Sequence, residues 1–209
     1  MESVVFEEVQ ASLVSSIARL HHDTLPDDFL PSLGLDFLEK VYYPAAITSK
    51  NGITLVAFVG KEPTGFVTVA HDSKSFTHDI LRTNLLALAK YSLRAILRDA
   101  RYLIKNIQVF WSAVIASPDA IKGEIVYIAV GQDYQGQGIG KKLVRAALDY
   151  LRLKGCDFCR TKTLAENVGV IKMYEKMGWR VRDHFRLIGL DYVTIVSPPI
   201  HSHAISSGK

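Results

Sequence analysis

The stretch from residue 124 to residue 153 constrains the fold more than any other part of the chain. It opens with an apolar run, EIVYIAV over 124–130, that predicts a buried strand. A glycine-rich turn follows over 131–140, and apolar side chains then recur at helical spacing at Leu143, Val144, Ala147, Leu148 and Leu151. A strand that leads through such a turn into an amphipathic helix predicts an α/β domain in which helices cover a sheet.

The rest of the chain supplies further strands and helices. Strands are predicted at 3–9, 53–59, 66–70, 156–163, 179–188 and 192–196, and helices at 10–22, 32–47, 79–107 and 167–177. No internal repeat and no linker-like composition divides the sequence. We therefore expect one domain over residues 1–197, with a helical insertion at 79–107, followed by a mobile tail at 198–209.

Composition narrows the functional classes. The 209 residues are 48% hydrophobic and 22% charged with a formal net charge of +4, which is typical of a globular protein and not of a disordered or fibrous one. Two cysteines cannot form a disulfide framework, and Glu2, Glu7 and Glu8 stand where a secretory signal would be basic and then apolar. The longest uncharged apolar stretch, near 107–118, is too short to span a bilayer. We expect a cytoplasmic protein.

The segment from Gln135 to Gly140 (QGQGIG) has the chemistry of an anion site. Where a glycine-rich turn opens a helix, backbone N–H groups converge, the helix dipole adds partial positive charge, and the missing side chains let a phosphate come close. Two familiar motifs fit poorly, because Lys142 stands where a P-loop needs Ser or Thr and the glycine spacing is wrong for a dinucleotide fingerprint. The alternative is a turn that only tightens the junction between strand and helix.

Two segments together resemble a known family. Gln135, Gly138 and Gly140 match the Q/R-x-x-G-x-G/A signature of the GNAT superfamily of acyl-CoA-dependent N-acyltransferases. Residues 167–179 (NVGVIKMYEKMGW) are similar to that family's N-x(6)-Y-x-x-x-G-[FW] segment, and residues 124–130 look like its fourth strand. The resemblance covers about residues 120–185 and is compatible with the order of elements over 1–75 and 185–197.

This resemblance implies a fold and an acyl donor. The fold is α/β (α+β): a central mixed, mostly antiparallel sheet with splayed fourth and fifth strands, flanked by helices, here with a helical insertion between the third and fourth strands. The donor is acetyl-CoA, with its pyrophosphate on the loop amides and its pantetheine arm along the fourth strand, where one amide also polarises the thioester. The implied CoA-binding residues are Ile128, Ala129, Val130, Gln135, Gly136, Gln137, Gly138, Ile139, Gly140, Lys141 and Asn167.

The resemblance also implies two catalytic residues. Tyr174 is expected to protonate the leaving CoA thiolate, and the alternative is a tyrosine that only packs on the sheet. Glu124 opens the fourth strand where some family members carry a glutamate base, and the alternative is a solvated acid. Further candidates lie in the loops that border the expected acceptor pocket, namely His21, His22, Asp23, His71, Asp72 and His78, and Glu166 adjoins Asn167.

The predicted insertion at 79–107 is rich in basic and apolar residues. Five of its basic residues fall on one helical arc beside a broad apolar face: Lys90, Arg94, Arg98, Arg101 and Lys105. Such a helix packs on the domain or on a second copy in a homodimer, or it lies against membrane phosphates or a lipid-linked acceptor. Nucleic-acid binding is disfavoured, because no groove-reading motif accompanies these charges.

Cys156 and Cys159 form a C-x-x-C pair that we interpret as buried structural thiols. On the strand predicted at 156–163 their side chains would point to opposite faces, unlike those of a redox motif at a helix start. The histidines offer no clear second pair of ligands, so no metal site is expected.

The resemblance, together with these observations, implies an N-acetyltransferase that moves an acetyl group from acetyl-CoA to a small primary amine by direct attack in a ternary complex. The sequence leaves three alternatives open: another acyl group, a hydroxyl or amino-sugar acceptor, and a CoA-binding sensor without activity. A basic helix beside the site favours an anionic acceptor.

Overall fold

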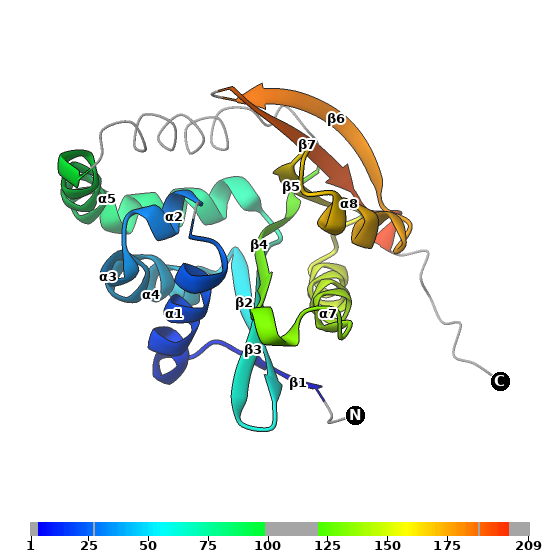
Figure 1. The fold of residues 1–209 in the computed structure, drawn as a ribbon, viewed down its shortest axis with the longest axis horizontal. Coiled ribbons are helices and arrows are strands. Elements are labelled where there is room, and N and C mark those ends of the chain that lie inside the picture. Colours follow the sequence, from blue (N-terminus) through cyan, green and yellow to red (C-terminus); the bar gives the residue numbers. More distant parts are fainter. Residues whose placement is uncertain (1–3, 27, 99–120, 188, 201–209) are drawn as a thin grey trace.

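The computed structural model describes residues 4–26, 28–98, 121–187 and 189–200. Within these residues seven strands form one sheet in the order β1-β2-β3-β4-β5-β7-β6 (Figure 1). The strands are β1 Val4–Glu8, β2 Gly52–Val59, β3 Glu62–Ala70, β4 Gly123–Val130, β5 Cys159–Leu164, β6 Arg180–Leu187 and β7 Leu190–Val196. The helices are α1 Val14–Thr24, α2 Phe29–Ser32, α3 Leu35–Phe37, α4 Tyr43–Thr48, α5 Ser73–Arg98, α7 Ile139–Leu153 and α8 Val168–Glu175, with a π-helical turn at Leu38–Tyr42 and 3-10 turns at Ala11–Leu13 and Gln132–Tyr134.

The sheet is mixed and mostly antiparallel, as predicted. Its one parallel pair among the described residues, β4 with β5, is joined at only two positions, Gly123 with Cys159 and Glu124 with Arg160. Beyond these positions the two strands diverge, and β5 pairs with β7 instead. The predicted splay of the fourth and fifth strands is therefore confirmed.

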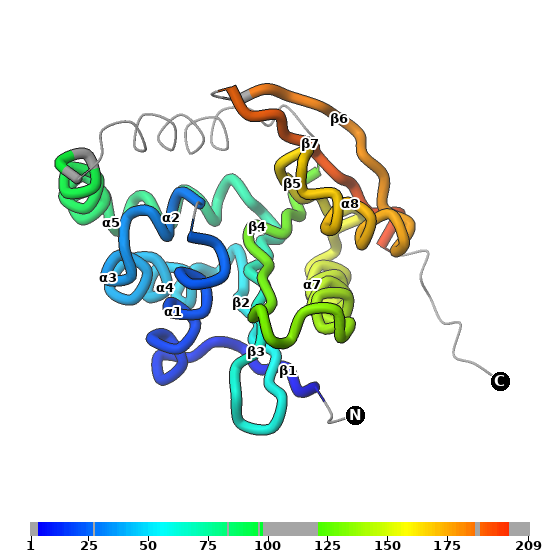
Figure 2. Tube along the Cα trace, viewed as in Figure 1, coloured from blue at the N-terminus to red at the C-terminus, as the bar shows by residue number. Residues whose placement is uncertain are grey.

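Side chains alternate across the sheet and build one core on each face. On β3, Phe66 and Ala70 belong to the core that packs against α1, the π-helical turn and α5, whereas Val67 and Val69 belong to the core that packs against α7. Helices α1 to α5 accordingly lie on one side of β2–β4 and α7 lies on the other (Figure 2). We call these the α1–α5 core and the α7 core.

A β-bulge in β4 changes which face its side chains reach. Thr68 pairs with Tyr127 and Val69 with Ile125, which leaves Val126 as an extra residue. Val126 and Tyr127 therefore both pack against the α1–α5 core, while Ile125 and Ile128 pack with the α7 core. The bulge turns Tyr127 toward the same face as α1, just beyond the point where β4 and β5 separate.

Predicted boundaries differ from the structure at α5 and β5. Helix α5 begins at Ser73, six residues before the expected 79, because the Asp72 carboxylate accepts a hydrogen bond from the Ser75 amide at 3.0 Å and caps it. It bends at Asn84, whose φ of −134° is not helical, and residues 99–107 of the expected insertion lie outside the described residues. Strand β5 begins at Cys159 and not at 156.

At the other end of the chain, ordered packing extends into the range expected to be a tail. Ile200 is buried and its amide donates to the Asp157 carbonyl at 2.8 Å, whereas residues 201–209 lie outside the described part. No helix among the described residues has the length and apolar character needed to cross a membrane.

Candidate active site

The outer edge of β4 faces the gap left by the diverging β5. The Gly131 amide donates to the Thr64 carbonyl at 2.8 Å, so it faces β3. Because backbone groups alternate in direction along an antiparallel strand, the amides of Val130 and Ile128 face the gap, and Ala129 turns its backbone toward β3. The Val130 carbonyl confirms this direction, because it accepts a hydrogen bond at 3.2 Å from the Gln135 side chain in the loop and not from β3.

The glycine-rich loop leaves a backbone surface without side chains at the start of α7. Gly136 and Gly138 adopt left-handed φ values of 76° and 80°, and a Cβ atom added to either would meet nothing within 4 Å. Gly138 is the N-cap of α7 and has no side chain to cap this end, so within the described part of the chain the start of this 15-residue helix lacks a side-chain cap. This arrangement fits an anion.

Other loop residues have structural roles. A Cβ on Gly140 would lie 3.2 Å from the Met173 sulfur, so this glycine allows α7 to approach α8 closely. Ile139 is buried in the α7 core. The Gln137 side chain donates to the Asp133 carbonyl at 3.2 Å, so it shapes the loop, while Lys141 is half-buried on the first turn of α7.

Tyr174 lies on α8 with its ring 4.6 Å from that of Trp179, at 1% exposure. Its hydroxyl makes no hydrogen bond within the described part of the chain. Burial, with a smaller effect of the Cys159 thiol, raises the pKa of Tyr174, although the Thr161 hydroxyl lies close enough to oppose this. Tyr174 is therefore a protonated phenol at neutral pH, and its buried hydroxyl lies near Thr161 of β5.

Asn167 caps α8, which accounts for its place in the sequence. Its Oδ1 accepts from the Val170 amide at 3.4 Å, and its Nδ2 donates to the Thr163 hydroxyl at 3.4 Å. The side chain is exposed at the end of β5, so it remains open to a further partner.

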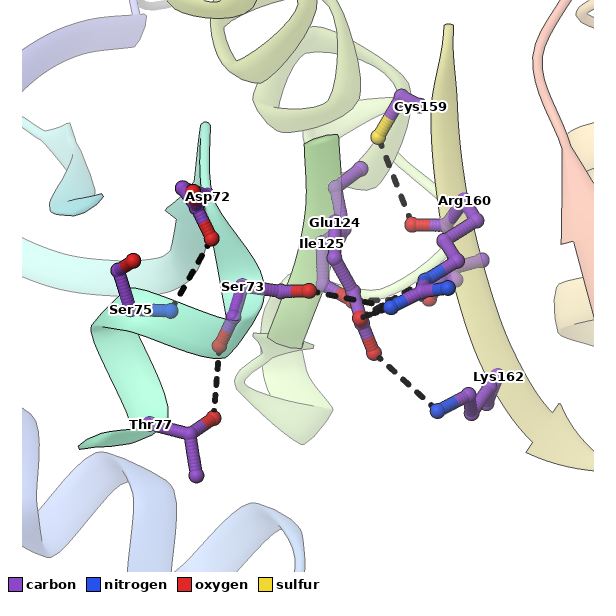
Figure 3. Close-up of polar contacts among 10 residues, drawn as sticks. Asp72, Ser73, Ser75, Thr77, Glu124, Ile125, Cys159, Arg160 and Lys162 are labelled. Carbon is purple, nitrogen blue, oxygen red and sulfur yellow. Dashed lines mark hydrogen bonds and ion pairs between the residues drawn. The ribbon is translucent and has the colours of Figure 1, made fainter. Parts of the chain in front are cut away.

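Glu124 lies at the apex of the gap in a cluster of charges (Figure 3). Its Oε2 accepts from Arg160 Nε at 2.9 Å and Nη2 at 2.8 Å, and its Oε1 lies 3.7 Å from the Lys162 ammonium. Arg160 Nη2 also donates to the Ser73 hydroxyl at 3.1 Å, which ties β5 to the first residue of α5. The side chains of Arg160, Glu124 and Lys162 are 3%, 14% and 21% exposed.

This cluster limits how Glu124 can take part in proton transfer. The lone pairs of Oε2 are engaged by the guanidinium, so a proton from an acceptor has access only to Oε1, which Lys162 approaches. The role of Glu124 as a base stays a prediction. The cluster carries two cations and one anion, so it has a surplus positive charge at the apex.

The weaker acid–base candidates occupy different places. His21 is fully buried, its Nδ1 is 3.0 Å from the Tyr43 hydroxyl and its Nε2 makes no hydrogen bond within the described residues. Burial, with a smaller effect of His22, lowers the pKa of His21 to about 3, so this ring is neutral at physiological pH. The other candidates lie elsewhere. The His71 ring is hydrogen-bonded to the Tyr150 hydroxyl on α7, and Asp72 caps α5. His22 pairs with Asp23, and His78 and Glu166 are exposed.

Sequence reasoning missed the residues that gather around Tyr127. Burial raises the pKa of the Tyr127 phenol, with further effects of Tyr42, Asp28, Glu124 and Tyr192. These side chains come from the π-helical turn, the residue before α2, β4 and β7, so the α1–α2 connection and the last hairpin converge on this face of β4. No sequence signal points to Tyr127, because only the bulge at Val126 turns it to this face.

Cys156 and Cys159 are free thiols, and they lie differently from what we expected. Cys156 precedes β5 and is half-buried, with its thiol 3.5 Å from the His71 carbonyl, while Cys159 is fully buried on the strand. Among the described residues no group of three or more His, Cys, Asp or Glu is placed to hold a metal ion.

Comparison with known proteins identifies the family. Residues 15–179 match the family model described as the acetyltransferase (GNAT) family. The chain is 39% identical over 67 residues to N-alpha-acetyltransferase 30 of Saccharomyces cerevisiae (32% of this chain, 38% of that protein). It is also 38% identical over 55 residues to a mycothiol acetyltransferase of Saccharopolyspora erythraea (26% of this chain, 18% of that protein).

Solved structures agree on the fold. The ribosomal-protein-S18-alanine N-acetyltransferase of Escherichia coli superposes with a TM-score of 0.60 at 12% identity and 99% coverage of both chains. A chain of the NatC complex bound to Gag peptide and CoA gives 0.55 at 20% identity, over 95% of this chain and 99% of that one. The first curated relatives are matched over only about half of their length or less. On the match across residues 15–179, the chain belongs to the GNAT family of acetyltransferases.

Proposed function

We propose that the protein transfers an acetyl group from acetyl-CoA to a primary amine. The observation that carries the proposal is the open edge of β4 beyond Glu124, which leads directly to the uncapped, glycine-lined start of α7. An extended chain with a pyrophosphate at one end and a thioester at the other fits this path.

Each part of acetyl-CoA has a matching group on the protein. The open faces of Gly136 and Gly138 and the first-turn amides of α7 hold the pyrophosphate, with Lys141 and Lys142 adding positive charge. The amides of Ile128 and Val130 face the pantetheine arm and the thioester. Gln135 and Gln137 act through the loop conformation that their side chains stabilise.

The transfer follows from these positions. The neutral amine attacks the thioester carbonyl carbon, and the resulting oxyanion accepts a hydrogen bond from a β4 amide. The carbon–sulfur bond then breaks, and the electron pair leaves with sulfur. Tyr174 donates its proton to the thiolate, and the proton lost by the amine passes to Glu124 through water.

Tyr174 fits this role because its hydroxyl is both buried and unsatisfied within the described residues. Its raised pKa keeps the proton on the phenol at neutral pH, so Tyr174 is in the form that can donate a hydrogen bond and then a proton to the departing thiolate. Most buried tyrosines hydrogen-bond their hydroxyl, as Tyr43 does with His21, although Tyr42 is a second buried tyrosine without such a bond among the described residues.

Relatives support an amine as the acceptor. They include proteins named for N-alpha-acetylation and for mycothiol acetylation. The surplus positive charge of Arg160 and Lys162 beside Glu124 favours an acceptor that also carries an anionic group. A cytoplasmic location and a homodimer remain predictions.

A second candidate is CoA binding without transfer, and the engagement of Glu124 by Arg160 favours it. Titration calorimetry with acetyl-CoA, followed by a free-thiol assay over a panel of amines with and without a carboxylate, separates the two. Binding with amine-dependent thiol release supports the transferase. Binding without release with every amine supports the second candidate, and absence of binding contradicts both.

A further inference from the structure

Helix α5 presents large apolar side chains to solvent beyond its bend at Asn84. Leu85, Leu86, Leu93 and Leu97 are 66%, 87%, 57% and 79% exposed, and we call them the leucine stripe. The opposite side of the same helix packs into the α1–α5 core through Ala87, Leu88, Tyr91 and Ala95. The helix is therefore anchored on one side and uncovered on the other, within the described residues.

The stripe is continuous along the helix. Leu85, Leu93 and Leu97 are separated by multiples of four residues, with the exposed Ala89 between them and Leu86 alongside. At about 100° and 1.5 Å per residue these side chains cover an arc of about 120° and a length of about 18 Å. Single exposed leucines need no explanation, but a contiguous apolar strip of this size indicates a surface that docks on something.

Positive charge borders the stripe. Lys90 and Arg94 are exposed along one side of it, and Arg94 is held over the Tyr91 ring at 5.7 Å. No Asp or Glu occurs between Ile80 and Arg98. Asp36 of α3, the carboxylate that Arg94 influences, already pairs with Lys40 at 2.8 Å.

We propose that the leucine stripe docks on an anionic lipid bilayer, with the leucines in the headgroup region and Lys90 and Arg94 on lipid phosphates. Leucines beside lysine and arginine are typical of helices that lie in the plane of a membrane surface. A second copy of this chain fits the stripe less well. A twofold pairing of the two helices would bring their basic side chains together, and no Asp or Glu of this part of the helix would neutralise them. Helix α5 lies on the opposite side of β2–β4 from α7 (Figure 1), so docking leaves the glycine-rich loop uncovered.

The test is co-sedimentation of the full chain with phosphatidylcholine vesicles that contain 0% or 30% phosphatidylglycerol, at low and high salt. We expect binding to the anionic vesicles that weakens with salt. Leu86→Asp and Leu93→Asp are each expected to lower the partition coefficient about tenfold or more. Lys90→Gln and Arg94→Gln are each expected to lower it about fivefold.

The matched control is Leu153→Asp at the end of α7. Leu153 is 83% exposed and follows Arg152 and precedes Lys154, but it lies off the stripe, so its variant is expected to bind vesicles like the wild type. Circular dichroism melts of every variant exclude unfolding as the cause of lost binding. The proposal fails if the wild type does not bind anionic vesicles, or if Leu153→Asp weakens binding as much as Leu86→Asp. It also fails if Leu86→Asp converts a dimer to a monomer and no protein binds vesicles. Acetyl-CoA binding is measured separately and is expected to be unchanged in all stripe variants.

Discussion

Replacing Tyr174 by Phe removes one buried oxygen and is expected to stabilise the free protein. The side chain is 1% exposed and its hydroxyl has no hydrogen-bond partner among the described residues, so the folded state bears a desolvation cost of about 1–3 kcal/mol. The approach of Thr161 offsets part of this cost. We expect Tyr174→Phe to raise the free energy of unfolding by about 1 kcal/mol, which raises Tm by about 2–4 °C for a chain of this size.

The same substitution is expected to slow acetyl transfer. The departing thiolate loses its proton donor, and general acid catalysis typically contributes about 10²–10⁴-fold to a rate. The kcat for thiol release from acetyl-CoA is therefore expected to fall by about a hundredfold or more, while the calorimetric Kd for acetyl-CoA changes little. A more stable but slower enzyme is the signature of a hydroxyl kept for catalysis.

Tyr43→Phe is the matched control. Tyr43 is equally buried, but its hydroxyl is 3.0 Å from His21 Nδ1, so its loss leaves that nitrogen without this partner and lowers the free energy of unfolding by about 1 kcal/mol. Urea unfolding and thermal melts measure both variants. The reasoning is refuted if the two variants shift stability in the same direction, or if Tyr174→Phe keeps the wild-type kcat.

Three further predictions concern the loop, the charge cluster and the buried histidine. Gly138→Ala is expected to raise the Kd for acetyl-CoA at least about tenfold, because its Cβ stands where the pyrophosphate approaches. Gly60→Ala is the control: its φ of 61° is similar and its surroundings are also open, so it shares the backbone strain of about 1 kcal/mol but should keep the wild-type Kd. Equal changes of Kd in calorimetry would contradict the loop assignment. Arg160→Met leaves the half-buried Glu124 carboxylate without its guanidinium and is expected to lower the free energy of unfolding in urea by about 3 kcal/mol. Adding Glu124→Gln removes the unpaired charge and is expected to restore part of this loss. A double variant less stable than Arg160→Met would contradict the assigned ion pair. The pKa of His21 is lowered to about 3, while an unfolded histidine titrates near about 6.5, so the unfolded state takes up the proton first as pH falls. The free energy of unfolding is therefore expected to fall by about 2 kcal/mol between pH 6.5 and 5. His21→Asn should lack this part of the pH dependence, and equal pH dependence of stability in the two proteins would disprove the assignment.

The glycine-rich loop and the central strand could be predicted because each leaves a local trace. Glycines at 136 and 138 are needed where φ is positive, and residues 124–130 form an apolar run that identifies a central strand. The family resemblance supplied the mostly antiparallel sheet and its splay, which no periodicity encodes. The start of α5 could not be predicted, although Asp is a residue type that often caps helices and Asp72 does so here. His78 and the polar residues before it interrupt the helical spacing of apolar side chains.

The surroundings of Glu124 could not be predicted. Arg160 and Lys162 lie two residues apart on β5, and only the two-residue pairing of β4 with β5 brings them to the Glu124 carboxylate. The position of Tyr127 likewise depends on the bulge at Val126, which changes the face of every following side chain and leaves no mark on the sequence pattern. Both features arise from register, which is a property of strand pairs and not of single segments.

The gap between β4 and β5 makes the sheet structurally incomplete at its centre. Most proteins expose unpaired strand edges only at the margins and protect them, since an open edge is a template for association with other chains. Here the open edge belongs to the fourth of seven strands, and a bound pantetheine would complete the sheet as a missing strand does. Acetyl-CoA would then act as a folding ligand as well as a substrate, adding about 2.7 kcal/mol of stability at a hundred times its Kd and shielding the molecule from edge-to-edge aggregation whenever the donor is abundant.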